Sequence, residues 1–120
     1  MLERESYLSL ATYRRDGRSV ETPVWFAAEA ASLWVFTARD AGKVKRLRNS
    51  SRARVAACDA RGKVHGAWQD AKAFIVDDPA RVARANTLLR AKYGWMMWIT
   101  DLFSRLSGRY DKRAYLEIRL

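Results

Sequence analysis

The stretch Thr37–Asn49, with the sequence TARDAGKVKRLRN, carries the strongest structural and functional signal in the chain. It follows the apolar run 32–36, whose composition predicts a β-strand. Asp40 fits the N-cap of a short helix whose apolar side consists of Val44 and Leu47. The stretch therefore predicts a strand that passes directly into the N-terminus of a basic helix, with a small fold built around this junction.

The N-terminus of this helix has the chemistry of an anion site. The first amide N–H groups of a helix lack intrahelical partners, and the peptide dipoles place partial positive charge there. Gly42 lets a ligand approach the backbone, and Lys43 and Arg46, one turn apart, can reach the same phosphate. The alternative is a short solvated helix that covers one end of a barrel, and the residues alone leave both interpretations open.

Length and charge indicate the class of protein. The chain has 120 residues, of which 49% are hydrophobic and 30% charged, and this is typical of one globular domain over residues 1–120. The formal net charge is +10, and every ionisable residue between Asp40 and Asp59 is basic. We therefore expect a partner with negative charge, such as a phosphorylated cofactor, a nucleic acid or an anionic membrane surface.

The sequence also indicates a compartment. Its single cysteine, Cys58, excludes an intrachain disulfide and fits a reducing environment. The polar start 1–5 does not resemble a secretory signal, and no apolar run approaches the roughly 20 residues of a membrane span. We therefore expect a cytoplasmic protein.

Six β-strands are predicted, linked mostly by hairpins. They are the segments 7–13, 19–27, 32–37, 52–58, 63–76 and 114–120. Asp16 and Gly17 form the dipeptide of a tight hairpin turn, so the first two strands pair antiparallel. Pro23 cannot donate a ladder hydrogen bond and marks an edge, a bulge or an opening of the sheet. Gly66 predicts a kink in the long fifth strand.

Two further helices are predicted before the last strand. Asp78 and Pro79 mark the start of the first, which ends near Gly94. From Trp95 to Leu106 apolar residues recur at helical spacing, as in an amphipathic helix that packs on the barrel or on a second subunit. Contact of this helix with a membrane surface is the alternative. Together the elements predict a mainly β fold with flanking helices, namely a small antiparallel barrel.

Three segments resemble the pyridoxamine 5′-phosphate oxidase-like split β-barrel family, and within it the branch of F420-dependent oxidoreductases. They are residues 22–26 (TPVWF), residues 37–49 and residues 58–62 (CDARG). The resemblance covers nearly the whole chain, including the closing segment 116–120. It implies a homodimer that binds FMN or the deazaflavin F420 in a groove between the subunits.

The resemblance also implies which residues bind the cofactor. The matching positions are Pro23, Val24, Trp25, Thr37, Gly42, Lys43 and Arg46. The first three would lie against the tricyclic ring, Thr37 at its edge or at the ribityl-like chain, and the last three at the phosphate. From the basic run that continues past them, Arg48 is also predicted to bind the cofactor. The family often has Ser where this sequence has Ala41, so one hydroxyl donor to the phosphate is missing here.

The chemistry implied by the resemblance belongs to the cofactor. Hydride enters or leaves its central ring, so the protein positions a small, unsaturated or hydrophobic organic substrate, and no catalytic residue or metal is required. His65, the only histidine, is weak evidence for zinc. The alternatives are an FMN-binding flavoprotein of the same fold and a non-enzymatic flavin or haem protein with a storage or sensor role. A basic nucleic-acid binder is a further alternative, but the sequence lacks a base-stacking motif.

The basic run further predicts that F420 is preferred over FMN. The tail of F420 continues beyond its phosphate into a chain of glutamates and so carries more negative charge than FMN. Lys45, Arg48, Arg52 and Arg54 extend the basic run past the residues assigned to the phosphate. Several such cations acting together would favour the longer anion.

Overall fold

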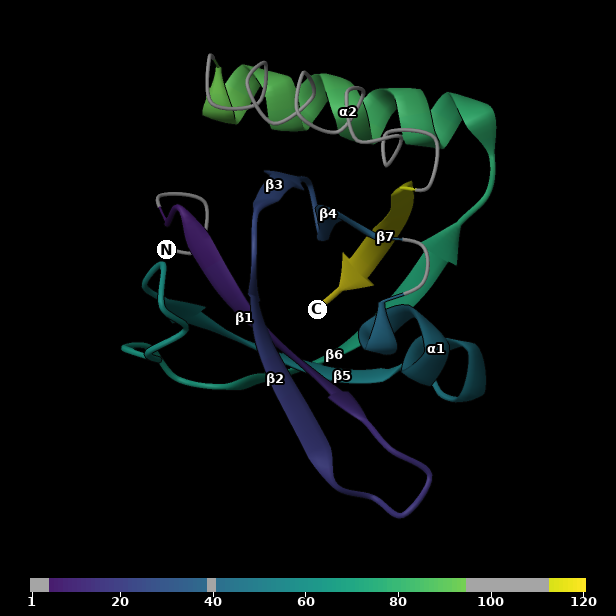
Figure 1. Ribbon diagram of the computed structural model, residues 1–120. Helices are drawn as coiled ribbons and strands as arrows, with labels where there is room; N and C mark the ends of the chain where they lie inside the picture. The colour runs from purple at the N-terminus through teal and green to yellow at the C-terminus, as the bar shows by residue number, and fades with distance from the viewer. Residues whose placement is uncertain (1–4, 39–40, 95–112) are drawn as a thin grey trace.

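The computed structural model describes residues 5–38, 41–94 and 113–120 (Figure 1). In chain order its elements are β1 (Tyr7–Tyr13), β2 (Ser19–Val24), β3 (Phe26–Glu29), β4 (Ser32–Ala38), α1 (Gly42–Asn49), β5 (Arg52–Cys58), β6 (Gln69–Val76), α2 (Pro79–Tyr93) and β7 (Arg113–Arg119). The described part thus contains one strand more than the six that the sequence predicts.

The seven strands form one antiparallel sheet in the order β2-β1-β5-β6-β7-β4-β3. β2 and β3 lie at opposite ends of this order, yet only Trp25 separates them in the chain. The sheet must therefore curl until its two ends meet, which makes a barrel that is split between β2 and β3 (Figure 1). The predicted split antiparallel barrel is confirmed, and Pro23 lies in a strand at the end of the sheet order, as expected for a residue without an N–H donor.

Alternating side chains of the strands fill the barrel. The buried interior cluster consists of Leu8, Leu10, Val24, Phe26, Leu33, Val35, Leu47, Ala53, Val55, Ala73, Leu116 and Ile118. Leu47 is the contribution of α1, whose two apolar residues are both buried. The short basic helix is therefore anchored by its apolar side in the interior, while Lys45 and Arg48 are exposed and Lys43 and Arg46 are half-buried.

The second helix, α2, packs on the outside of the barrel over β3 and β4 (Figure 1). Asp78 caps its start by accepting a hydrogen bond from the Ala80 N–H at 3.2 Å, and Gly94 ends it with a φ of +56°. Leu89 and Tyr93 are buried against the outer face of the sheet. Both predicted ends of this helix are confirmed, because the local capping residues determine them.

The prediction of one strand over residues 19–27 is wrong, because the chain is interrupted at Trp25. The Phe26 N–H donates to the Tyr93 hydroxyl at 2.9 Å, and this hydroxyl lies 2.8 Å from the carbonyl oxygen of Ser6. The Trp25 ring stacks on the Tyr93 ring at 4.5 Å. Burial raises the pKa of Tyr93 to about 12, so the hydroxyl keeps its proton. A residue of α2 thus stabilises the split of the barrel.

Two other boundaries differ from the predicted ones. β6 begins at Gln69, and of the preceding residues 63–68 only Val64 forms a bridge, with Cys58. Asp59 explains this delay, because its carboxylate accepts hydrogen bonds from the N–H groups of Arg61 and Lys63 and holds a wide turn. The N-cap of α1 is Ala41 and not Asp40.

The predicted helix Trp95–Leu106 lies outside the described residues. Within the described ranges, no helix is both long and apolar enough to cross a membrane.

Candidate functional site

The N-terminus of α1 lacks the features that usually neutralise a helix start. Ala41 offers no side-chain cap, and the first turn has no acidic residue. The Arg46 guanidinium folds back over Gly42, where an added Cβ would meet one of its terminal nitrogens at 2.8 Å. The absence of a side chain at Gly42 therefore lets a cation lie beside the positive end of the helix. This arrangement favours a bound anion.

Arg46 is held in place by a buried hydroxyl. Its Nε donates to Thr12 Oγ1 at 2.6 Å, and Thr12 in β1 has no exposed surface. Burial and then the charge of Arg14 lower the pKa of Arg46 from its ordinary value. The guanidinium is thus oriented by a neutral partner, and none of the ion pairs among the described residues includes it, so we call its charge uncompensated within that part of the chain.

Lys43 and Thr37, both predicted site residues, lie together. The Lys43 ammonium donates to Thr37 Oγ1 at 3.3 Å. Burial lowers the pKa of Lys43, and the positive charge of Arg46 lowers it further. A bound phosphate would relieve both effects, because an opposite charge favours the ammonium form.

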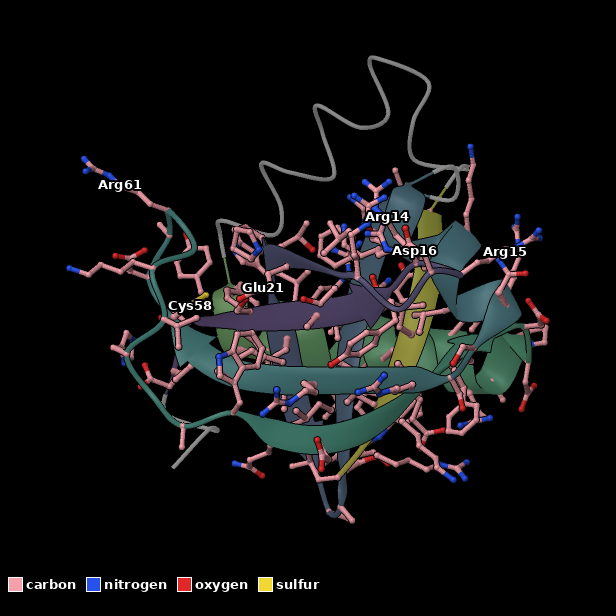
Figure 2. All side chains as sticks on the ribbon, turned by 90° about the horizontal axis from the view of Figure 1, so that it is seen from below. Arg14, Arg15, Asp16, Glu21, Cys58 and Arg61 are labelled. Atoms are coloured by element: carbon pink, nitrogen blue, oxygen red, sulfur yellow. The ribbon has the colours of Figure 1, made fainter. Side chains whose placement is uncertain are left out.

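A cavity of about 440 Å³ lies between α1 and the β1–β2 hairpin. It is lined by Arg14, Arg15, Asp16, Arg18, Gly42, Lys45, Arg46 and Asn49. Figure 2 shows Arg14, Arg15 and Asp16 beside α1, whereas Arg61 projects from the opposite end of the barrel. We refer to this space as the hairpin cavity. Lys43 does not line it, so Arg46 and Gly42 are the predicted phosphate residues that open into it.

Arg48, also predicted to bind the cofactor, lies elsewhere. It lines a cavity of about 490 Å³ between α1, α2 and the start of β7, together with Val44, Val82 and Asn86. The helical repeat explains this placement, because residues two apart on a helix face different directions. The structure therefore does not bring Arg48 together with Arg46.

The three residues predicted to contact the tricyclic ring have different surroundings. Pro23 is exposed on β2, close to the turn residue Gly62. The Val24 side chain is buried in the barrel interior, so only its backbone can face a ligand. Trp25 is half-buried between Tyr93 and Phe36. Pro23 of β2 pairs with Ser9 of β1, and Thr12 lies three residues further along β1. Pro23 and Thr12 are therefore about 10 Å apart along the sheet.

The basic surface predicted to bind a glutamate tail is not continuous. The Arg52 guanidinium lies 4.0 Å over the Tyr13 ring, and Arg54 lies over Trp68 and within 3.4 Å of Asp70. Strand alternation places these arginines on the outer face of the sheet, away from the hairpin cavity. Of the four cations assigned to the tail, Lys45 alone lines that cavity.

Residues that could hold a metal ion are not gathered in the described ranges, where no group of three or more His, Cys, Asp or Glu side chains is present. His65 Nδ1 instead lies 3.8 Å from Glu5 Oε1. Cys58 is buried, and this burial, together with Asp59, raises the pKa of its thiol. A buried thiol with a raised pKa is a poor nucleophile.

Sequence reasoning missed the residues that orient the site. Thr12 supports Arg46 from a strand, and nothing in its neighbourhood marks it apart from other strand threonines. From the sequence, Arg14, Arg15 and Arg18 are only neighbours of the predicted hairpin turn. Their number is the signal that could have found them, because several cations around one tight turn repel one another unless an anion lies nearby.

Comparison with known proteins agrees with this architecture. The family model for pyridoxamine 5′-phosphate oxidase matches residues 1–120. No curated protein matches the chain.

Several solved structures share the fold. A haem storage protein from Vibrio cholerae has a TM-score of 0.71 at 13% identity, covering 96% of this chain and 81% of its own. An FAD-binding protein from Mesorhizobium loti has a TM-score of 0.64 at 17% identity, covering 99% and 82%. An F420 reductase has a TM-score of 0.63 at 17% identity, covering 98% and 88%.

Proposed function

The chain belongs to the pyridoxamine 5′-phosphate oxidase family, and from this premise we propose that it is an oxidoreductase that binds F420. It would transfer a hydride between this deazaflavin and a small, unsaturated or hydrophobic organic substrate. The observation that carries the proposal is the uncompensated cation at the start of α1. Arg46, oriented by Thr12, lies across Gly42 at a helix N-terminus without a cap or an acidic residue.

These residues fit a phosphorylated cofactor. The open space at Gly42 admits a phosphate to the helix N-terminus, and Arg46 and Lys43 would neutralise it from two sides. The exposed Pro23 edge, about 10 Å along the sheet from Thr12, would receive the ring. When bound, the deazaflavin supplies the hydride chemistry. The chain itself binds the phosphate, orients the ring and limits water at the split between β2 and β3.

A flavin is the competing type of cofactor, because one similar fold is an FAD-binding protein, and FMN is the flavin that the family resemblance implies. A non-enzymatic haem protein is the second candidate, since another similar fold stores haem. Titration with F420 and with FMN, followed by fluorescence, separates the first two. The absorption spectrum of the purified protein reports haem. Tighter binding of FMN, or haem at full occupancy, would contradict the F420 proposal.

The phosphate contact has its own test. Replacing Lys43 with Ala should weaken cofactor binding about ten- to hundredfold, because a charge-assisted hydrogen bond contributes about 1.5–3 kcal/mol. Lys72→Ala, which removes an exposed lysine of β6, is the matched control and should leave affinity unchanged. Unchanged affinity in a folded Lys43→Ala protein would exclude Lys43 from the phosphate site.

We also propose that the protein is a homodimer, as the family resemblance implies. Phe74 on β6 and Leu120, directly after the neighbouring strand β7, are exposed large apolar side chains and would gain from cover by a second subunit. Sedimentation at micromolar concentration tests this, and a monomer would contradict it. The substitution Phe74→Glu should weaken association if this surface is in the interface.

A further inference from the structure

We propose that the β1–β2 hairpin forms a second anion subsite beside α1, so that the cofactor bound at Gly42 and Arg46 carries a further anionic group, of the oligocarboxylate type, into the hairpin cavity. This inference rests on the proposed function. It names which residues recognise the tail of the cofactor. It replaces the basic surface predicted from the sequence, which the structure shows to be discontinuous, with a set of residues that shares only Lys45 with it.

The first argument is charge. Around the hairpin cavity, the cations Arg14, Arg15, Arg18, Lys45 and Arg46 face one carboxylate, that of Asp16. Asp16 is already engaged, because it accepts hydrogen bonds from the backbone N–H and the guanidinium of Arg18. The other cations therefore meet one another across the cavity without an acidic partner in the described residues that line it. Such crowding is unfavourable unless an anion enters.

The second argument is that two separate elements build the cavity. Thr12 at the end of β1 binds Arg46, and the Arg15 guanidinium donates to Asn49 Oδ1 at 3.4 Å. Both contacts connect the hairpin to the last turn of α1. The hairpin itself is closed by Gly17, with a φ of +91°, and by the Arg14 N–H, which donates to the Arg18 carbonyl oxygen at 2.8 Å. The arginines are thus carried by an ordered turn.

The third argument is length. Gly42 and Asn49, the first and last residues of α1, both line the cavity. At 1.5 Å per residue they are about 10 Å apart along the helix axis. A phosphate at Gly42 occupies only one end of this space. The opposite end is bounded by Arg15, which contacts Asn49 and would remain without an anion if the bound molecule ended at its phosphate.

The test compares two deazaflavin ligands, F420 with its glutamate tail and the same phosphate compound without the glutamates. At low salt the natural protein should bind the tailed ligand about tenfold or more tightly, and added salt should reduce this preference. The double variant Arg14→Ala/Arg15→Ala should lose the preference and keep its affinity for the trimmed ligand. Arg61→Ala/Lys63→Ala removes two cations from the turn at the opposite end and should keep the preference.

The outcomes separate the inference from the proposed function. A preference that survives in Arg14→Ala/Arg15→Ala, or one that is absent from the natural protein, overturns the inference while the phosphate site stands. If neither deazaflavin binds, the proposed function fails, and the subsite is tested by calorimetry with inorganic phosphate and tripolyphosphate. Tripolyphosphate should then bind more tightly than phosphate only when Arg14 and Arg15 are present, and equal affinities would overturn the subsite. Thermal unfolding should show that both double variants are folded.

Discussion

Two basic residues of each described helix have opposite kinds of partner. In α2, Arg81 and Arg84 form ion pairs with Glu117 and Glu29, and the helix is capped at both ends. Like α2, α1 contains four basic residues. In α1, however, the side chains of Lys43 and Arg46 donate hydrogen bonds to neutral threonine hydroxyls, and the start of the helix has no side-chain cap. Charges that are neutralised within the fold stabilise it, whereas charges left uncompensated at a helix start are available to a ligand.

Because its partners lie within the fold, we expect α2 to contribute strongly to the free energy of unfolding. Leu89 of α2 is fully buried against the sheet, so Leu89→Ala should lower the free energy of unfolding by about 2–5 kcal/mol through lost burial and the cavity left behind. Leu88→Ala, at the half-buried neighbour, should cost less. Urea denaturation measures both. Equal costs at the two positions would show that α2 does not pack as described.

A smaller effect is expected for the hydroxyl that stabilises the split. Tyr93→Phe keeps the ring but leaves the Phe26 N–H without its acceptor, which should cost about 1–3 kcal/mol. Because Trp25 stacks on this ring, its fluorescence should change little. A variant as stable as the natural protein would mean that the Phe26 N–H is satisfied elsewhere.

Giving α1 the cap that α2 already has should sharpen the comparison. Ala41→Ser places a hydroxyl at the N-cap, where it can accept from the first turn, and should raise stability by about 0.5–2 kcal/mol. Chemical denaturation measures the gain. No gain, in a folded variant, would indicate that the first N–H groups of α1 already have partners.

The smallest expected effect is a pH dependence of cofactor binding. Burial, followed by Arg46, holds the pKa of Lys43 below its usual 10.5. Affinity for a phosphorylated cofactor should be highest while the Lys43 ammonium is charged, and it should fall as the pH rises through this lowered pKa. The phosphate of F420 does not interfere, because it is a diester whose only ionisation lies far below this pH range. Lys43→Arg keeps its charge, so its affinity should stay level over the same range, and a parallel decline would exclude Lys43 as the cause.

Local chemistry explains which parts of the fold could be predicted from the sequence. The hairpin at Asp16 and Gly17 and both ends of α2 follow from residues within a few positions, so they were predicted correctly. The split at Trp25 depends on Tyr93, 67 residues from the Phe26 N–H it accepts. No local pattern encodes such a contact. The sequence therefore predicts one strand over residues 19–27, where the structure has β2 and β3.

The candidate site was predictable to the same extent. Gly42 and Arg46 follow from helical spacing, and the structure places them together. Arg48 was predicted at the same site, but the structure places it at another cavity, because residues two apart on a helix do not share a face. Thr12 and the hairpin arginines reach α1 only through the tertiary fold, so the sequence marks their charge but not their position.

The most direct test of the account is the dissociation constant of F420 for Arg46→Gln, measured by fluorescence beside the natural protein and Arg61→Gln. Glutamine keeps a donor for Thr12, so the fold should persist while the cation at α1 is lost. We expect about ten- to hundredfold weaker binding for Arg46→Gln, as for loss of a charge-assisted hydrogen bond, and no change for Arg61→Gln. Equal affinities of Arg46→Gln and the natural protein would contradict a cofactor phosphate at the start of α1.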